Sequence, residues 1–455
     1  MISWPVMLAI LTIAALFTGF PVGFVLAGCA SLVAFAAIVG GTFDPALLQA
    51  LPGRLWQIFT NPYFTAIPPF ILLGLFIDRA GLAAAAVAGM VQAFGHSRFG
   101  LNASIILAGG LLAAVTGIVG ASVIALTLIA APLLLNARLS KSHVAGLVCA
   151  TGTLGQIIPP SIVLLLLADV IHNANAEAEL ARGNFAPDPV TVIDLFAASL
   201  LPGLLLIAAY LLWSWLSSRR DQAADSGVEF TEVKREANVI RPGWAVSAMV
   251  GLIAIVLGGI FSGIVTVTEA AALGAALAAM IAAFRCSRQV WFSTLTEGAV
   301  IAGAVFTILL GATVWSLVFR GLGGDALVAD ALSTVPGGLF GALLVVMAAI
   351  FVAGFFLEII EILLIFVPLT APALIMLGAD PVWLAVLIAL NLQTSFLTPP
   401  MGISLFYFKS AAPPGITTLD IYKGVVPFVI MQLLTLLNVA LMPAVATGLP
   451  SLLFD

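Results

Sequence analysis

Long apolar segments follow one another along almost the whole chain, and this repetition limits the possible folds more than any other feature of the sequence. A helix that spans a membrane needs about 20 apolar residues. Segments of about this length or shorter occupy 3–19, 22–40, 56–77, 101–117, 119–136, 144–168, 193–216, 244–261, 266–284, 298–319, 337–357, 360–378, 382–397, 402–412 and 424–447. Several of the shorter ones adjoin a proline or glycine, which is typical of half-helices and re-entrant arms. We therefore expect roughly ten to twelve true crossings.

Charged residues make up only 8% of the 455 residues, whereas soluble domains average about 25%. So few charges could not cover the surface of a water-soluble fold, but a bilayer needs no such cover because lipid surrounds the apolar exterior. The net charge is −5 without a basic run, which excludes typical nucleic-acid binding. The sequence thus predicts an all-α polytopic membrane protein.

Motifs for membrane-enzyme chemistry are missing, since the sequence contains neither HExxH nor GxGD. The histidines lie near segment ends and form no cluster: His96, His143 and His172. The cysteines stand singly in apolar stretches, where buried thiols are expected: Cys29, Cys149 and Cys286. We therefore expect no enzyme activity and no cofactor.

Lysines and arginines indicate the orientation in the membrane. The polar stretch 217–241 carries five of them, which predicts a cytoplasmic connector over 217–243 and an outside N-terminus. The first residues lack the basic region of a cleaved signal peptide, so the first apolar stretch is expected to stay in the mature protein. A bacterial inner membrane is the expected location.

The connector separates two halves, 1–216 and 244–455, in which similar motifs follow in the same order. Gly117 precedes the first proline of one Pro-Pro pair by 42 residues, and Gly354 precedes that of another by 45, at Pro159 and Pro399. With an outside N-terminus the halves have opposite topology, the inverted-repeat plan of secondary transporters. Chance similarity between apolar segments is the alternative.

Each Pro-Pro pair must break a helix, because proline supplies no N–H and clashes with the preceding turn. In a membrane the freed carbonyls are tolerated where they line a wet cavity or hold a cation. We expect hairpins near 144–168 and 382–412 and sodium at their polar residues; a simple packed kink is the alternative. The candidate sodium-binding residues are Gly117, Gly120, Ser122, Gln156, Pro159, Pro160, Ser161, Thr394, Ser395, Thr398, Pro399 and Pro400.

Ionisable residues inside apolar segments are candidates for substrate binding or coupling, because a charge there is costly. Glu358 and Glu361 stand three apart on one helix face; a structural ion pair is the alternative. Arg320 either clamps a substrate carboxylate or lies at the membrane interface. Glu269 either belongs to the site or stabilises the N-terminus of its own helix through its negative charge.

Five motifs together resemble one family, the large membrane subunit of tripartite ATP-independent periplasmic (TRAP) transporters, DctM type. They lie at 116–122, 155–161, 268–271, 354–358 and 398–402, and the resemblance runs nearly end to end. This sequence departs from the family pattern at two of these motifs: Glu358 stands where many members have Asp, and Val267 stands where a proline is common.

The resemblance implies an elevator-type fold with inverted repeats and two re-entrant helical hairpins. It also implies sodium-coupled uptake of a carboxylate or related small organic acid. The implied partners are a small four-helix membrane subunit (DctQ type) and a periplasmic substrate-binding protein. A stand-alone cation-coupled transporter and a passive channel are the alternative functions.

Overall fold

A computed structural model describes residues 3–117, 119–222 and 242–454, and every regular element in these ranges is a helix. The first half contains α1 (Trp4–Leu16), α2 (Val22–Val39), η1 (Pro45–Ala50), α3 (Leu51–Thr60), α4 (Pro62–Thr65), α5 (Ile67–Arg79), α6 (Leu82–Phe94), α7 (Arg98–Thr116), α8 (Val119–Asn136), α9 (Lys141–Gly152), η2 (Thr153–Gln156), α10 (Ile162–Ala181) and α11 (Val192–Gln222). The second contains α12 (Pro242–Phe261), α13 (Val267–Ala283), α14 (Arg288–Gly321), α15 (Gly324–Ser333), α16 (Gly338–Ala353), α17 (Ile359–Met376), α18 (Pro381–Leu397), α19 (Ile403–Ala411), α20 (Thr418–Leu441) and α21 (Ala444–Phe454). The prediction of an all-α fold is confirmed.

Eight helices in the described ranges are long and apolar enough to cross a membrane, and a bent pair at 45–79 would make a ninth. This is below the ten to twelve crossings expected from the sequence. Other apolar helices, such as α16 and α18, are shorter than a full crossing, and α18 ends just before Pro399 and Pro400. The chain is a multi-pass membrane protein.

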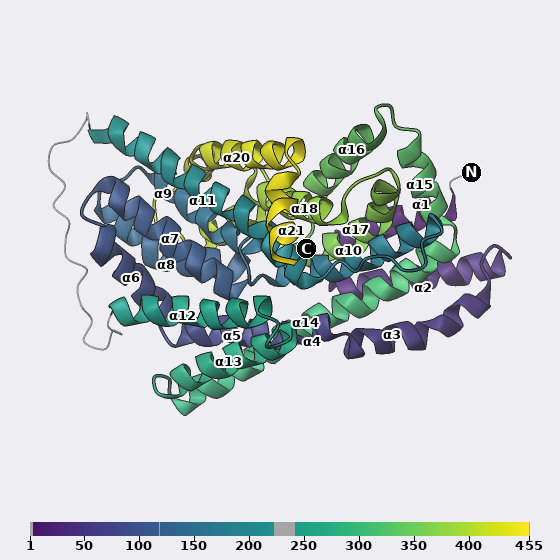
Figure 1. Ribbon diagram of the computed structural model, residues 1–455, viewed down its shortest axis with the longest axis horizontal. Coiled ribbons are helices and arrows are strands. Elements are labelled where there is room, and N and C mark those ends of the chain that lie inside the picture. Colours follow the sequence, from purple (N-terminus) through teal and green to yellow (C-terminus); the bar gives the residue numbers. More distant parts are fainter. Residues whose placement is uncertain (1–2, 118, 223–241, 455) are drawn as a thin grey trace.

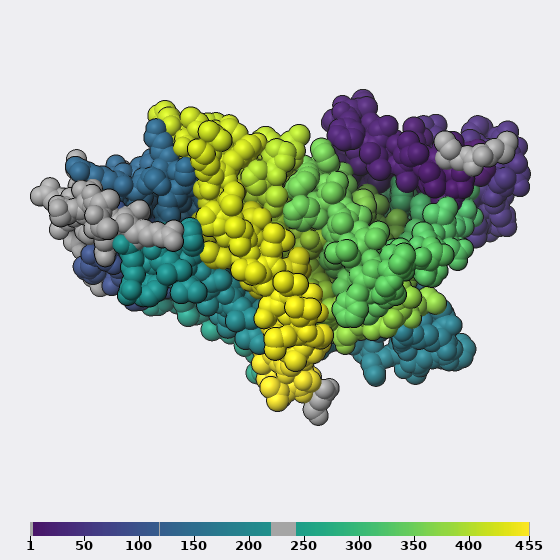
Figure 2. Space-filling model, turned by 90° about the horizontal axis from the view of Figure 1, so that it is seen from above, coloured from purple at the N-terminus to yellow at the C-terminus, as the bar shows by residue number. Residues whose placement is uncertain are grey.

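The helices pack in two groups that also contact each other, for example where α6 packs on α7 (Figure 1). In the first group, α2 packs on α14, α5 on α13 and α6 on α12. In the second, α9 packs on α20 and α10 on α17, while α21 covers α11. Figure 2 shows the C-terminal residues, in yellow, crossing the middle of one face between the teal and green parts.

Two glycines face each other in the second group, where α9 crosses α20. Gly146 on α9 faces the backbone of Gly424 on α20, and a Cβ at either position would collide with the facing helix. Small residues at such crossings let helix backbones come together in membrane proteins, where close packing is a main source of association energy. These two glycines therefore fix the α9–α20 contact, which joins the two halves of the chain.

The two halves also share an internal arrangement. Gly109 on α7 lies against Thr151 on α9, 42 residues later. In the second half, the Nδ2 of Asn391 on α18 donates to the carbonyl of Met347 on α16, 44 residues earlier, at 2.8 Å. One turn further on, Ser395 contacts Phe351 in the same way, with Oγ 2.6 Å from the carbonyl oxygen. Thus α7 and α16 are equivalent helices of the two halves, because each runs parallel to the helix that precedes a proline pair.

Several smaller predictions can be compared with the structure. Glu269 completes a capping box with Thr266 at the start of α13, the structural alternative for this residue. Cys29 and Cys149 are buried as expected, but Cys286 is only half-buried, because it lies in the turn after α13. Of the connector predicted over 217–243, residues 217–222 form the end of α11 and residues 242–243 the start of α12, whereas residues 223–241 lie outside the described part of the chain.

Candidate functional site

The first polar turn lies between α7 and α8. Gly117 ends α7 with a φ of +60°, a conformation that glycine adopts without steric cost, and α8 begins at Val119. Gly109 and Leu126, on opposite sides of the turn, lie against each other, so the two helices form an antiparallel hairpin. Beside the turn, the hydroxyl oxygens of Thr116 and Ser122 are 2.6 Å apart. We call the described residues of this turn, 116–117 and 119–122, the first tip.

The first tip touches the first proline break. The Cα of Gly117 faces the backbone nitrogen of Ile162, where α10 begins. The predicted hairpin segment 144–168 is thus α9 with η2 and the start of α10, meeting at Pro159 and Pro160. These arms have different main neighbours, α8 and α20 for α9 but α17 for α10.

Side chains replace the hydrogen bonds that the first proline pair removes. Pro160 has no N–H for the carbonyl of Gln156, and the Ser161 hydroxyl donates to that carbonyl instead, at 3.3 Å. Ser161 Oγ also accepts from the backbone N–H of Val163 and so caps α10. The side-chain amide of Gln156 is fully buried and has no hydrogen-bond partner among the described residues. An orphaned amide of this kind is suited to hold a ligand, because leaving it unpaired is costly.

At the second proline break, a serine hydroxyl again replaces the missing backbone hydrogen bond. Pro400 supplies no N–H for the carbonyl of Phe396, and the Ser404 hydroxyl donates to it at 2.5 Å. Both the Pro159–Pro160 and the Pro399–Pro400 peptide bonds are cis.

Hydroxyl groups in and before the second break all donate to backbone carbonyls. Thr394 donates to Leu390 at 2.8 Å, Ser395 to Phe351 at 2.6 Å, and Thr398 to Thr394 at 2.7 Å. A hydroxyl that has donated its proton still presents lone pairs. These neutral oxygens have the chemistry that a small hard cation requires.

The second polar turn, 354–358, lies between α16 and α17, and we call it the second tip. Gly354 packs against Ser395 and Phe396 of the second break. Glu358 caps α17, and its backbone N–H donates to Glu361 Oε2 at 3.3 Å. Glu361 is buried, whereas Glu358 is exposed. In the described ranges neither carboxylate forms an ion pair with a basic side chain.

One side chain, Tyr407 on α19, contacts both tips. Its hydroxyl donates to Glu358 Oε1 at 3.3 Å, and its ring lies against Gly120. The sequence prediction did not include this residue. The available signal was a hydroxyl-bearing aromatic in the short apolar segment 402–412, directly after a proline pair.

Arg320 lies elsewhere. Its guanidinium is 3.0 Å from Glu177 on α10 and 3.6 Å from Asp325 on α15. It also reaches the carbonyl of Pro368 at 3.5 Å, which is free because Pro372 cannot donate to it. Burial raises the pKa of the Asp325 carboxyl, an effect that Arg320 opposes. The structure thus gives Arg320 protein partners and does not bring it to the tips.

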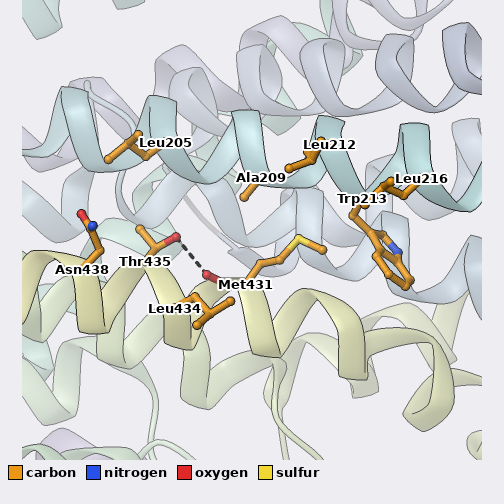
Figure 3. A pocket seen from close by; sticks show the side chains of 9 residues that line it. All are labelled: Leu205, Ala209, Leu212, Trp213, Leu216, Met431, Leu434, Thr435 and Asn438. Atoms are coloured by element: carbon orange, nitrogen blue, oxygen red, sulfur yellow. Dashed lines mark hydrogen bonds between the residues drawn. The ribbon is translucent and has the colours of Figure 1, made fainter.

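A groove separate from the tips opens between α11 and α20 (Figure 3). Its walls are mostly apolar, and the bond drawn there, from Thr435 to the carbonyl of Met431, lies within α20. The groove offers no charged side chain, so we do not assign it to an organic acid. The lining residues are Leu205, Ala209, Leu212, Trp213, Leu216, Met431, Leu434, Thr435 and Asn438.

Comparison with known proteins gives consistent matches along the chain. Residues 9–445 match the family model "Tripartite ATP-independent periplasmic transporter, DctM component". The chain is 30% identical to the C4-dicarboxylate TRAP transporter large permease protein DctM of Pseudomonas aeruginosa, over 90% of this chain and 91% of that protein. It is 28% identical to the ectoine TRAP transporter large permease protein TeaC of Halomonas elongata, over 97% and 98%.

A solved structure shares the fold. The YdaH transporter of Alcanivorax borkumensis, described as having an unusual topology, matches with a TM-score of 0.64 over 89% of each chain. The sequence identity is 15%. This match therefore supports the arrangement of the helices and nothing finer.

Proposed function

The chain belongs to the DctM family of tripartite ATP-independent periplasmic transporters, and on this basis we propose that it takes up a small organic acid together with sodium. Its relatives are transporter permeases, so the chain is a permease and not an enzyme. The proposed location is the bacterial inner membrane. The proposed partners are a small DctQ-type membrane subunit and a periplasmic substrate-binding protein.

The convergence of two tips and two proline breaks supports this proposal more than any other observation. Each tip touches the break of its own half, through Gly117 and Ile162 in one and Gly354 and Ser395 in the other. Broken helices of this kind bind ions and substrates in secondary transporters, because their free backbone and side-chain oxygens replace water. The buried, unpartnered amide of Gln156 marks a place where a ligand would relieve an unmet polar group.

We assign sodium to the oxygens at the two breaks and the acid to the space beside Glu358. The neutral hydroxyl and carbonyl oxygens around Ser161 and Thr398 are suited to a monovalent cation. Sodium bound beside the tips would also supply positive charge, which favours an anion close to an otherwise acidic turn. Binding of the two ligands would then be mutually favourable.

For movement across the membrane we propose an elevator step. The helix group containing both tips and both breaks, α7–α11 with α16–α21, would slide against the group formed by α1–α6 and α12–α14. A ligand drives such a step only if it binds the two end states with different affinity. Sodium would do so by holding the tips closed over the acid.

The relatives named above carry different substrates by name, C4-dicarboxylate in one case and ectoine in another. The test therefore begins with a thermal-shift screen of the partner binding protein against organic acids. The acid that binds is then used for uptake into proteoliposomes containing the permease and its small subunit. We expect uptake only with the binding protein and an inward sodium gradient.

Unchanged uptake after potassium replaces sodium would refute sodium coupling. Uptake that proceeds equally well without the binding protein would favour a stand-alone transporter, and uptake without saturation would favour a channel.

A further inference from the structure

The two tips are joined through a side chain that belongs to neither. Gly120 lies three residues after Gly117 in the first tip, and Glu358 lies four residues after Gly354 in the second. Gly120 and Glu358 therefore belong to corresponding turns of the two halves. Tyr407 lies between them, with its ring against the first and its hydroxyl on the second.

The absence of a side chain at position 120 is what admits the ring. A methyl group there would stand 2.9 Å from Cζ of Tyr407 and 3.0 Å from Cε2. The first distance is shorter than carbon atoms tolerate and the second is tighter than ordinary contact, so the ring would have to shift. Because the hydroxyl is bonded to Cζ, such a shift would also pull it from Glu358, whose bond is already long at 3.3 Å.

Tyr407 is also tied to the second break. It lies on α19, which begins at Ile403, three residues after Pro400. The neighbouring Ser404 on this helix closes the break by donating to the Phe396 carbonyl. A change at the second break therefore moves the helix that carries Tyr407, and through it the contacts with Gly120 and Glu358.

We propose that Tyr407 is a positioning residue that couples the two tips, so that sodium bound at one break raises the sodium affinity of the other. This inference rests on the proposed sodium coupling. The contacts of Tyr407 with both tips exist only while both tips hold these positions. A ligand that orders one tip thus holds the Tyr407 ring in the position that the other tip contacts. Because coupling between sites is reciprocal, a ligand at the second tip has the same effect on the first.

A space-filling role is the competing explanation, and the hydroxyl separates the two. Tyr407→Phe keeps the ring beside Gly120 and removes only the bond to Glu358. If Tyr407 merely fills space, this change leaves sodium binding as it was. If Tyr407 couples the tips, it lowers the cooperativity of sodium binding.

The experiment uses the permease purified with its small membrane subunit, with sodium chloride titrated against choline chloride at constant ionic strength. The unfolding temperature reports binding. For the unaltered protein we expect a Hill coefficient clearly above 1; for Tyr407→Phe we expect about 1, with a sodium midpoint raised about fivefold. Gly120→Ala should act in the same direction because it displaces the ring. Tyr63→Phe, on α4 in the other helix group, is the matched control.

The outcomes are distinct. A sodium midpoint and Hill coefficient in Tyr407→Phe equal to those of the unaltered protein would overturn the coupling while leaving the proposed function intact. An unaltered protein that does not respond to sodium would instead overturn the sodium coupling itself, and this inference with it. A loss of cooperativity confined to Tyr407→Phe and Gly120→Ala would support the coupling.

Discussion

Gln393 and Thr153 stand at matching positions of the two halves, and they touch: the Gln393 Nε2 lies 3.5 Å from Thr153 Oγ1. Each residue precedes the first proline of its pair by six positions, at Pro399 and Pro159. Matching residues meet only where the axis that relates two repeats passes between them. The breaks therefore lie on either side of a shared polar centre.

That polar centre is closed by a further glutamine, Gln432 on α20. Its Nε2 donates to Tyr210 Oη at 2.8 Å and approaches Thr153 Oγ1 at 3.4 Å. Thr153, Gln393 and Tyr210 are fully buried, and Gln432 is 1% exposed. Thr153 thus accepts from two amides at once, and its loss would leave both without this acceptor.

Replacing Thr153 by valine should therefore destabilise the protein by about 1–3 kcal/mol, because buried donors lose their acceptor while the volume is unchanged. The measurement is the unfolding temperature of the purified protein. Thr296→Val is the matched control, since the Thr296 hydroxyl is exposed and bonds only within its own helix. An equal change in unfolding temperature for the two variants would show that the hydrogen bonds of the polar centre add no stability.

Gln156→Leu tests the unpartnered amide at the first break. Leucine has a similar size without polar atoms, so in the absence of sodium the variant should be as stable as the unaltered protein or more stable by about 1 kcal/mol. If the amide serves sodium, the variant also loses the stabilisation that sodium gives. A thermal-shift comparison in sodium and choline chloride measures both effects. A variant that is less stable in choline and equally responsive to sodium would contradict the assignment.

The sequence predicted the helical class and the place of both breaks, because apolar length and proline chemistry act locally. For Glu269 it left two roles open, and the capping role that the structure shows depends only on residues within one turn. It could not place Arg320, since the partners Glu177 and Asp325 come from other helices and only packing brings them together.

The sequence also could not find Tyr407. The reason this residue matters is its position between Gly120 and Glu358, which are 238 residues apart in the chain. No pattern along a single segment reports such a meeting. The proline pairs did predict where polar residues gather, but not which side chain joins the two tips.

Glu358→Ala should reduce uptake at least tenfold if this carboxylate binds the ion or the acid, because it removes the exposed one of the two carboxylates at the second tip. Initial uptake rates in proteoliposomes with both partners give the answer. Glu297→Ala is the control, since Glu297 forms an exposed ion pair with Arg79 within the other helix group. Near-normal uptake by Glu358→Ala would remove this residue from the site.

Arg320 allows a test between its two interpretations. If it clamps the acid, Arg320→Ala should raise the KM for uptake, because ground-state binding is lost. If it joins the helix groups through Glu177, as its contacts indicate, the variant should change the maximal rate and leave KM nearly unaltered. The charge exchange Arg320→Glu with Glu177→Arg, made together with Asp325→Asn so that two carboxylates do not face each other, restores an ion pair of opposite sense and should recover much of the rate. The Arg320–Glu177 pair is partly exposed, so its loss should lower the free energy of unfolding by only about 1 kcal/mol. A raised KM that the charge exchange does not correct would return Arg320 to the substrate site.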